Sequence, residues 1–144
     1  MKPAGAKVDF EQERNNELIK TYNRLLEECD FISMPAIYNQ LVEMPTTRFW
    51  VSEERAAIVI ASMMKGKSID NMQPNKREMF QEIYRRALLV IERDKTLSLL
   101  DVAMQVVLQP APKFYMTPGT AKVYITKAKK KWYEERKRKL RHLF

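Results

Sequence analysis

The chain repeats its own pattern at an offset of 65 residues, and this repeat constrains the fold more than any other feature. Residues 40–60 align without a gap over residues 105–125, and the ungapped alignment extends from residue 17 to residue 66. Within residues 40–60, the identical pairs are Gln40/Gln105, Val42/Val107, Pro45/Pro110, Phe49/Phe114, Ala56/Ala121 and Ile60/Ile125. Similarity at a fixed period indicates a duplicated structural unit. We therefore expect two copies of one unit within the 144 residues.

Each copy predicts three helices. The first helix of copy one is expected at about residues 9–28, where apolar residues recur at helical spacing. These residues are Phe10, Leu18, Tyr22, Leu25 and Cys29, which places Cys29 in the core. Its counterpart in copy two is expected to begin at Asn75, because Asn75 and Glu78 form a capping signal. Short second helices follow in both copies and end before Pro45 and Pro110, since proline lacks the N–H that a helix needs.

Matched capping residues predict where the later helices begin. Ser33 and Ser98 precede the second helices, and Ser52 and Thr117 precede the third, with Pro118 suited to a first helical position. The β-branched residues at 58–60 and 123–125 leave a strand open as the alternative. An apolar seam favours the helix in copy two, and it consists of Ala121, Ile125, Ala128 and Trp132. Phe49 and Phe114 are favoured as core residues, because identical rings in copies of different charge indicate shared packing.

The order of elements resembles the helix-turn-helix unit of DNA-binding proteins, over about residues 9–67 and again over about residues 75–133. The connections at 43–51 and 108–116 are longer than the three or four residues usual in that motif. The pattern is also loosely similar to small regulatory or DNA-packaging proteins of phages and mobile elements. The resemblance implies an all-α chain of two tandem three-helix repeats with a basic C-terminal helical extension. The expected boundaries are 1–68 and 75–133 for the repeats, 69–74 for a linker and 134–144 for the extension.

Composition makes an enzyme the weaker hypothesis. The single cysteine, Cys29, excludes an internal disulfide framework, and the single histidine, His142, excludes a two-histidine metal site within one chain. Three glycines leave no phosphate-binding loop of the nucleotide-binding kinds. We expect no catalytic residue, metal, cofactor or small-molecule substrate. The N-terminus lacks an apolar signal sequence, so the expected location is cytoplasmic, associated with the nucleoid if DNA is bound, and not membrane-bound.

The positive charge is confined to the C-terminal end. The chain carries a net charge of +8, yet the last 32 residues alone hold 11 lysines and arginines against two glutamates, a net of +9. A polyanion is the natural partner of such a concentrated field, and nucleic acid is the commonest one inside cells. A solubilising basic tail and an acidic membrane surface are the alternatives, the latter weakened by the scarcity of apolar residues here.

The main hypothesis is therefore a double-stranded DNA-binding protein, in the form of a transcriptional regulator. The third helix of copy two is expected in the groove, because its first turn is small, uncharged and rich in free N–H groups. The groove residues would be Thr117, Gly119, Thr120, Lys122 and Lys127. The phosphate contacts would be Lys113, Lys129, Lys130, Lys131, Arg136, Lys137, Arg138 and Lys139. In copy one, Arg48, Ser52 and Arg55 mark a second, weaker DNA half-site, with a protein partner or a symmetry mate as the alternatives.

The alternative hypothesis is a phage-type structural, packaging or assembly protein. It would form a homo-oligomer and touch DNA through its tail without reading sequence, with Trp50, Met63 and Met64 supplying the subunit contact. A catalytic role would need a metal site built from Glu27, Glu28, Asp30, Glu53 and Glu54, the only dense group of carboxylates.

Overall fold

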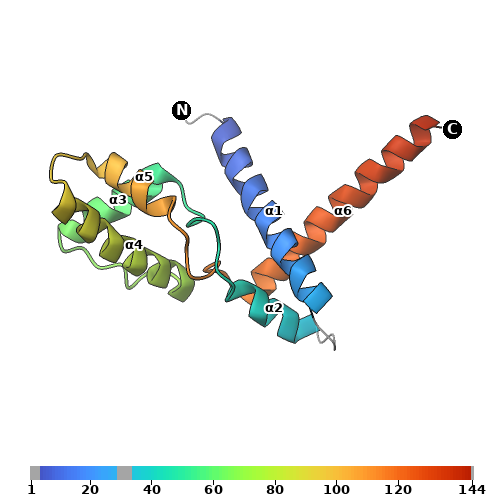
Figure 1. The fold of residues 1–144 in the computed structure, drawn as a ribbon, viewed down its shortest axis with the longest axis horizontal. Coiled ribbons are helices and arrows are strands. Elements are labelled where there is room, and N and C mark those ends of the chain that lie inside the picture. Colours follow the sequence, from blue (N-terminus) through green and yellow to red (C-terminus); the bar gives the residue numbers. More distant parts are fainter. Residues whose placement is uncertain (1–3, 29–33, 144) are drawn as a thin grey trace. The chain divides into compact units, whose positions relative to one another are not determined.

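The protein is all-helical over the residues that the structure, a computed structural model, describes: 4–28 and 34–143, with side chains placed for 10–28 and 34–142. Six helices are present in these ranges (Figure 1). They are α1 (Ala4–Glu28), α2 (Met34–Val42), α3 (Glu53–Met64), α4 (Pro74–Arg93), α5 (Leu99–Val107) and α6 (Pro118–Leu143). The all-α class is confirmed, and the strand alternative at 58–60 and 123–125 is wrong, because these residues lie in α3 and α6. The predictions for Cys29, Ser33 and Asp30 fall outside the described residues.

Side-chain caps set three of the helix starts. The Ser52 hydroxyl accepts a hydrogen bond from the Arg55 N–H at 3.1 Å, and the Ser98 hydroxyl accepts one from the Asp101 N–H at 3.2 Å. The Thr117 hydroxyl accepts one from the Thr120 N–H at 3.1 Å. Each bond satisfies a donor that the first helical turn leaves without a partner, so these three predictions are confirmed.

The start of α4 differs from the prediction. The helix begins at Pro74, one residue before Asn75, and Gln73 precedes it without a side-chain cap. Proline suits a first helical position because its φ is already helical and its missing N–H would have no partner there. The capping role predicted for Asn75 is therefore wrong.

The chain forms two compact units, and neither unit corresponds to one copy of the sequence repeat. The α1/α2/α6 unit combines residues 1–42 with residues 117–144, and the α3/α4/α5 unit is residues 43–116. Thus α3 packs against α4 and α5 of the other copy, while α6 packs against α1 and α2. The tandem three-helix repeats are not confirmed, because the two copies exchange their third helices. The predicted linker at 69–74 lies inside the α3/α4/α5 unit.

The connections between second and third helices explain how this exchange is built. Thr46 and Ala111 occupy the same position in the two copies and pair as an isolated antiparallel bridge, with N···O distances of 2.9 and 3.0 Å. Nearby, the Phe49 N–H donates to the Val107 carbonyl at 2.9 Å, which satisfies a carbonyl group at the end of α5. Each connection is thus held by backbone hydrogen bonds, and it is long enough to lead the third helix away from its own copy.

An apolar core fills the α3/α4/α5 unit. Phe49 is fully buried, and its ring stacks on Tyr115 with 6.0 Å between centroids. Phe114 is also buried, so the core role predicted for both phenylalanines is confirmed. Side chains from all three helices complete this core, including Ala56, Val59, Ile60, Met79, Phe80, Ile83, Ala87, Val102, Val106 and Val107.

Arg86 ties α4 to the second connection. Its guanidinium donates to the Pro110 carbonyl at 2.8 Å and to the Gln109 side-chain oxygen at 3.2 Å. It also bonds the Glu82 carboxylate at 2.9 Å and lies 4.9 Å from the centre of the Phe49 ring. Hydrogen bonds from Arg85 and Arg86 lower the pKa of Glu82 to about 2, against the opposing effect of burial. The Arg86 side chain therefore links α4 to the connection after α5 and to the Phe49 ring of the core.

The α1/α2/α6 unit has a shorter core. Leu18, Ile37, Leu41, Ala121 and Ile125 are almost fully buried. A stacked tyrosine pair adds to this core, with 5.7 Å between the ring centroids of Tyr22 and Tyr38. The predicted apolar seam of α6 is confirmed at Ala121 and Ile125 but is wrong at Trp132, which is 52% exposed. The seam ends early because α1 and α6 cross near α2 and then diverge (Figure 1), so Trp132 has no opposing apolar helix face.

Candidate nucleic-acid interface

The first turn of α6 is open and uncharged. Thr117 and Gly119 are exposed, and Thr120 is half-buried with its hydroxyl 2.9 Å from that of Thr117. A Cβ built on Gly119 meets only the Thr117 hydroxyl oxygen, at 4.0 Å, so the fold does not require glycine here. Free N–H groups and the positive end of the helix dipole make such a turn favourable for an anion.

The outer face of α6 carries two of the predicted groove lysines. Lys122 and Lys127 are exposed on either side of the buried Ala121 and Ile125. Sequence reasoning missed Val123, which is 48% exposed, and Thr126, which is also exposed on this outer face. The signal was available, since residues two and five positions after a buried Ala121 point away from the core in a helix of 3.6 residues per turn. Both side chains carry a methyl group of the kind that contacts thymine in a major groove.

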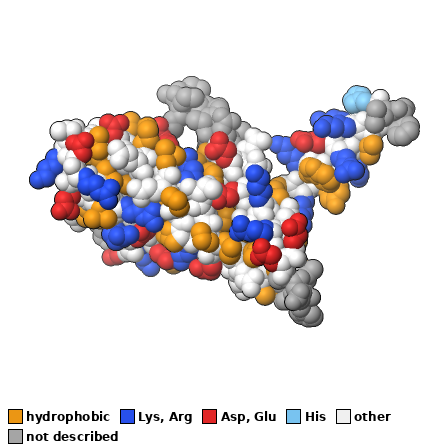
Figure 2. Space-filling model, viewed as in Figure 1, with side chains coloured by type: hydrophobic (Ala, Val, Ile, Leu, Met, Phe, Trp, Pro, Cys, Tyr) orange, Lys and Arg blue, Asp and Glu red, His pale blue; other side chains and the backbone are white. Residues whose placement is uncertain are grey.

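The C-terminal half of α6 is a basic rod. Every residue from Lys129 to His142 is exposed. Figure 2 shows lysine and arginine side chains crowding this arm, beside the hydrophobic side chains of the same segment. The predicted phosphate residues Lys130, Arg136, Lys137, Arg138 and Lys139 all lie here. Arg136 in addition lies 5.2 Å from the centre of the Trp132 ring. A helix of 26 residues is about 39 Å long, which matches roughly one turn of duplex DNA.

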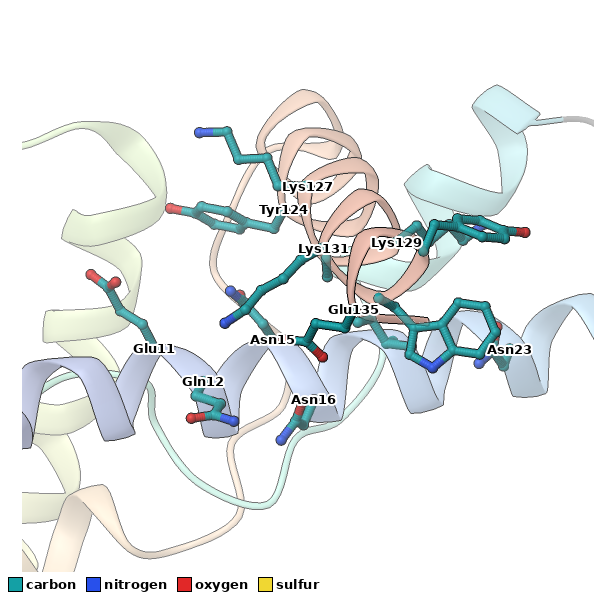
Figure 3. A pocket seen from close by; sticks show the side chains of 14 residues that line it. Glu11, Gln12, Asn15, Asn16, Asn23, Tyr124, Lys127, Lys129, Lys131 and Glu135 are labelled. Carbon is teal, nitrogen blue, oxygen red and sulfur yellow. The ribbon is translucent and has the colours of Figure 1, made fainter. Parts of the chain in front are cut away.

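Two of the predicted phosphate lysines face α1. The Lys129 amine lies 3.4 Å from the Tyr22 hydroxyl and 4.5 Å from the centre of that ring. Lys131 lines a groove between α1 and α6, where its amine lies near Asn15 (Figure 3). These lysines therefore do not share the outer face of α6 with Lys130.

Lys113 lies in the other compact unit and is held by carboxylates. Its amine is 2.7 Å from the Glu78 carboxylate and 3.9 Å from that of Glu43, and its side chain is only 21% exposed. The hydrogen bond to Glu78 raises the pKa of Lys113, with the nearby charges adding to the effect and burial opposing it. A lysine whose charge is already balanced by carboxylates is a poor phosphate contact.

Two of the three residues of the predicted second DNA half-site have structural contacts within the fold. Arg48 donates to the carbonyls of Phe49 and Val51, each at 3.0 Å, and lies 3.8 Å from the Glu53 carboxylate. The Ser52 hydroxyl caps α3, and Arg55 alone among the three is fully on the surface. Arg48 and Ser52 thus stabilise a turn and a helix end. Of the predicted subunit contacts, Met64 is exposed, whereas Trp50 and Met63 are half-buried.

Sequence reasoning missed the groove between α1 and α6. It has a volume of about 880 Å³ and is lined by α1 and α6 (Figure 3). Its α1 side presents the amides of Gln12, Asn15, Asn16 and Asn23. Their spacing places all four on one helix face. The repeat offered a signal, because Asn23 aligns with the apolar residue Leu88, and the same offset carried two residues beyond the alignment pairs Asn15 with Phe80.

Comparison of the chain with protein-family models, with curated proteins and with solved structures finds no significant match. Within the described ranges, no helix has the length and apolar character that crossing a membrane requires. Among those same residues, no three histidine, cysteine, aspartate or glutamate side chains gather in a way that would hold a metal ion.

Proposed function

We propose that the protein binds double-stranded DNA through α6, as a non-catalytic regulator of transcription. The observation that carries this proposal is the charge of α6, a single helix of 26 residues with ten lysines and arginines, whose C-terminal half, the basic rod, is exposed on every side. Such a density of cations has no counter-charge in α6 beyond Glu134 and Glu135. Phosphates of a duplex would supply it.

The two ends of α6 have different roles in this proposal. The first turn and outer face, with Gly119, Lys122, Val123 and Thr126, would enter the major groove, since these side chains are exposed and the backbone is accessible. The rod would follow the phosphates and supply affinity that is independent of sequence. Phosphate contacts set the register of a protein on DNA, whereas contacts to base edges give it sequence preference.

The test is fluorescence anisotropy of the full chain with random-sequence duplex DNA over a series of salt concentrations. We expect dissociation constants of about 1–100 μM at moderate salt, with affinity falling steeply as salt rises. Lys137→Gln should weaken binding to all sequences and reduce the salt slope by about one unit, while Lys122→Gln should reduce the differences in affinity among duplexes of defined sequence. Lys67→Gln, an exposed lysine of the α3/α4/α5 unit, is the matched control. Absence of binding at low salt would overturn the proposal.

One observation favours the alternative of an assembly protein. Leu100, Met104 and Leu108 are exposed, and their spacing along and just beyond α5 forms an apolar stripe. Stripes of this kind are found where protein partners dock. Light scattering on the purified chain distinguishes the two functions, because a closed higher oligomer favours assembly and a monomer or dimer favours a regulator.

A further inference from the structure

At the groove between α1 and α6, three of four lining positions carry smaller side chains than the equivalent positions of the other unit. In the α3/α4/α5 unit, Phe80 and Val59 belong to the buried core, and Tyr84 and Met63 are partly buried against that core. At the offset of 65 residues, the equivalent positions in the α1/α2/α6 unit hold Asn15, Tyr124, Ile19 and Ala128. An amide replaces a phenylalanine ring, an isoleucine replaces a tyrosine and a methyl group replaces a methionine side chain, whereas Tyr124 stands in place of the smaller Val59.

The groove has the chemistry of a nucleotide site. Its α1 side presents the row of amides, which donate and accept hydrogen bonds as base edges require. Its α6 side presents Trp132 and Tyr133, which are 52% and 60% exposed and meet edge to face with 5.1 Å between ring centroids. An exposed indole is a surface on which an unpaired base stacks.

Charge in the groove is mixed, with the positive sign in excess. Lys127, Lys129 and Lys131 line it together with Glu11 and Glu135 (Figure 3). Lys131 points across toward α1, close to Asn15, and is placed to meet a phosphate from within the groove. The carboxylates cannot contact phosphates favourably, but a carboxylate accepts hydrogen bonds from the amino group of cytosine.

We propose that this groove binds nucleotides of an unpaired DNA strand that adjoins the duplex held by α6. The bases stack on Trp132 and hydrogen-bond to the amides of α1, and Lys131 holds a phosphate. A volume of about 880 Å³ is in the range of pockets that take a ligand of drug size, so about two nucleotides fit. Intact duplex does not satisfy the site, because its base faces are already stacked on one another. The inference rests on the proposed function, since it requires α6 to hold the adjoining duplex.

The test compares three labelled DNAs with the full chain: a blunt duplex, the same duplex with a short thymine tail, and the same duplex with an abasic tail of equal length. The two tails carry the same phosphates, so any difference between them reports the bases alone. We expect the thymine tail to bind about tenfold more tightly than the abasic tail, in line with base stacking on an exposed aromatic ring.

Two variants locate the effect. Trp132→Ala removes the stacking surface from an exposed position and should abolish the difference between the tails while blunt-duplex affinity is kept. Asn15→Phe with Ala128→Met restores the bulk found in the other unit and should do the same by filling the groove. Met64→Ala, at an exposed apolar position of α3, is the control and should leave the difference intact.

The outcomes separate the inference from the proposed function. If the blunt duplex binds but the two tails bind equally, or if the Trp132→Ala variant keeps the preference, the groove inference is overturned and duplex binding stands. If no DNA with a duplex binds, whatever its tail, the proposed function fails, and the inference that rests on it fails as well.

Discussion

The α3/α4/α5 unit and the α1/α2/α6 unit are assembled from the same repeat, yet they use equivalent positions for different purposes. In the α3/α4/α5 unit these positions carry Met79 and Phe80, which are buried in the core, and Tyr84, which is partly buried against it. In the α1/α2/α6 unit they carry Arg14, Asn15 and Ile19, which are all half-buried, and Asn15 and Ile19 line the groove. The difference teaches that one unit has kept its interior for stability, whereas the other has traded apolar contacts for polar and charged groups that face outward.

The connections show the same division. Arg86 holds the connection after α5 with hydrogen bonds to Gln109 and Pro110. Its equivalent in the other copy is Thr21, which is buried and donates to the carbonyl of Glu17 within its own helix. Tyr115 also has a positive φ of 56°, a strained conformation for an aromatic residue that persists only where surrounding contacts hold it. Burial raises the pKa of Tyr115 to about 12, with the carboxylates of Glu82 and Glu78 adding to the effect.

The largest expected effect comes from the core of the α3/α4/α5 unit. Phe49→Ala should lower the free energy of unfolding by about 3–5 kcal/mol, because it leaves a cavity beneath Tyr115 and Arg86. Trp132→Ala, on the exposed part of α6, should change it by about 0.5 kcal/mol or less. Chemical denaturation of both variants measures the contrast, and equal losses would break the division into a stabilising and a binding unit.

A second effect concerns the arginine that ties α4 to the connection. Arg86→Ala should cost about 2–3 kcal/mol, since it removes bonds to two carbonyl-type oxygens and a close contact with the Phe49 ring. Arg85→Ala is the neighbouring control. Arg85 is exposed and donates to Glu82, as Arg86 does, but it does not bond to Gln109 or Pro110. Urea denaturation should place the Arg85 variant between the wild type and Arg86→Ala, because Arg85 bonds Glu82 but does not reach the connection. A loss for the control as large as that for Arg86→Ala would show that charge alone, and not the tie to the connection, is responsible.

Acid should weaken the same cluster. In the folded chain the pKa of Glu82 is lowered to about 2, because Arg85 and Arg86 bond its charged form. In the unfolded chain its pKa is near the ordinary value of 4.5. A carboxyl group whose pKa is lower in the folded state than in the unfolded state stabilises the fold. This contribution is complete above the pKa of the unfolded state and is lost as pH falls to the pKa of the folded state. Unfolding free energy should therefore fall between about pH 5 and pH 2, by less than the Arg86→Ala loss. Glu82→Gln should flatten that part of the profile, and an unchanged acid profile would contradict the assignment.

The smallest effects come from two matched helix caps, one in each unit. Ser52→Ala and Thr117→Ala should each cost about 1 kcal/mol, since each removes one capping hydrogen bond. Their effects on DNA should differ, because only Thr117 begins the helix proposed to enter the groove. Thermal unfolding and DNA anisotropy on the same two proteins sharpen the comparison. If Ser52→Ala weakened DNA binding as much as Thr117→Ala, α3 would have to contact DNA as well.

Much of the fold was predictable from the sequence because its determinants are local. Capping hydroxyls at Ser52, Ser98 and Thr117 and prolines after the second helices act within a few residues of where they stand. The exchange of third helices was not predictable in this way. The two third helices present the same apolar pair, Ala56 with Ile60 and Ala121 with Ile125, so either helix fits either partner. The long connections were the one sequence feature that pointed away from a tandem arrangement.

The exposure of the candidate site could be predicted for residues whose charge keeps them at the surface. It could not be predicted for residues whose contacts come from distant parts of the sequence. The lysines and arginines of the α6 rod are exposed, as their density required. The ion pairs of Lys113 were not predictable, because Glu43 and Glu78, which hold it, lie far away in the sequence. Trp132 fits the helical spacing of the seam, but its exposure depends on the divergence of α1 from α6, which no local pattern encodes.

The most direct test of the account compares two charge-matched triple variants in binding to random-sequence duplex DNA over a salt series. One replaces Lys122, Lys127 and Lys130 of α6 with glutamine, and the other replaces Lys65, Lys67 and Lys76 of the α3/α4/α5 unit; all six lysines are exposed. We predict that the α6 variant loses about tenfold or more in affinity and about two to three units of salt slope, while the other stays within about twofold of the wild type. Equal losses would contradict the claim that one unit binds DNA and the other is its scaffold.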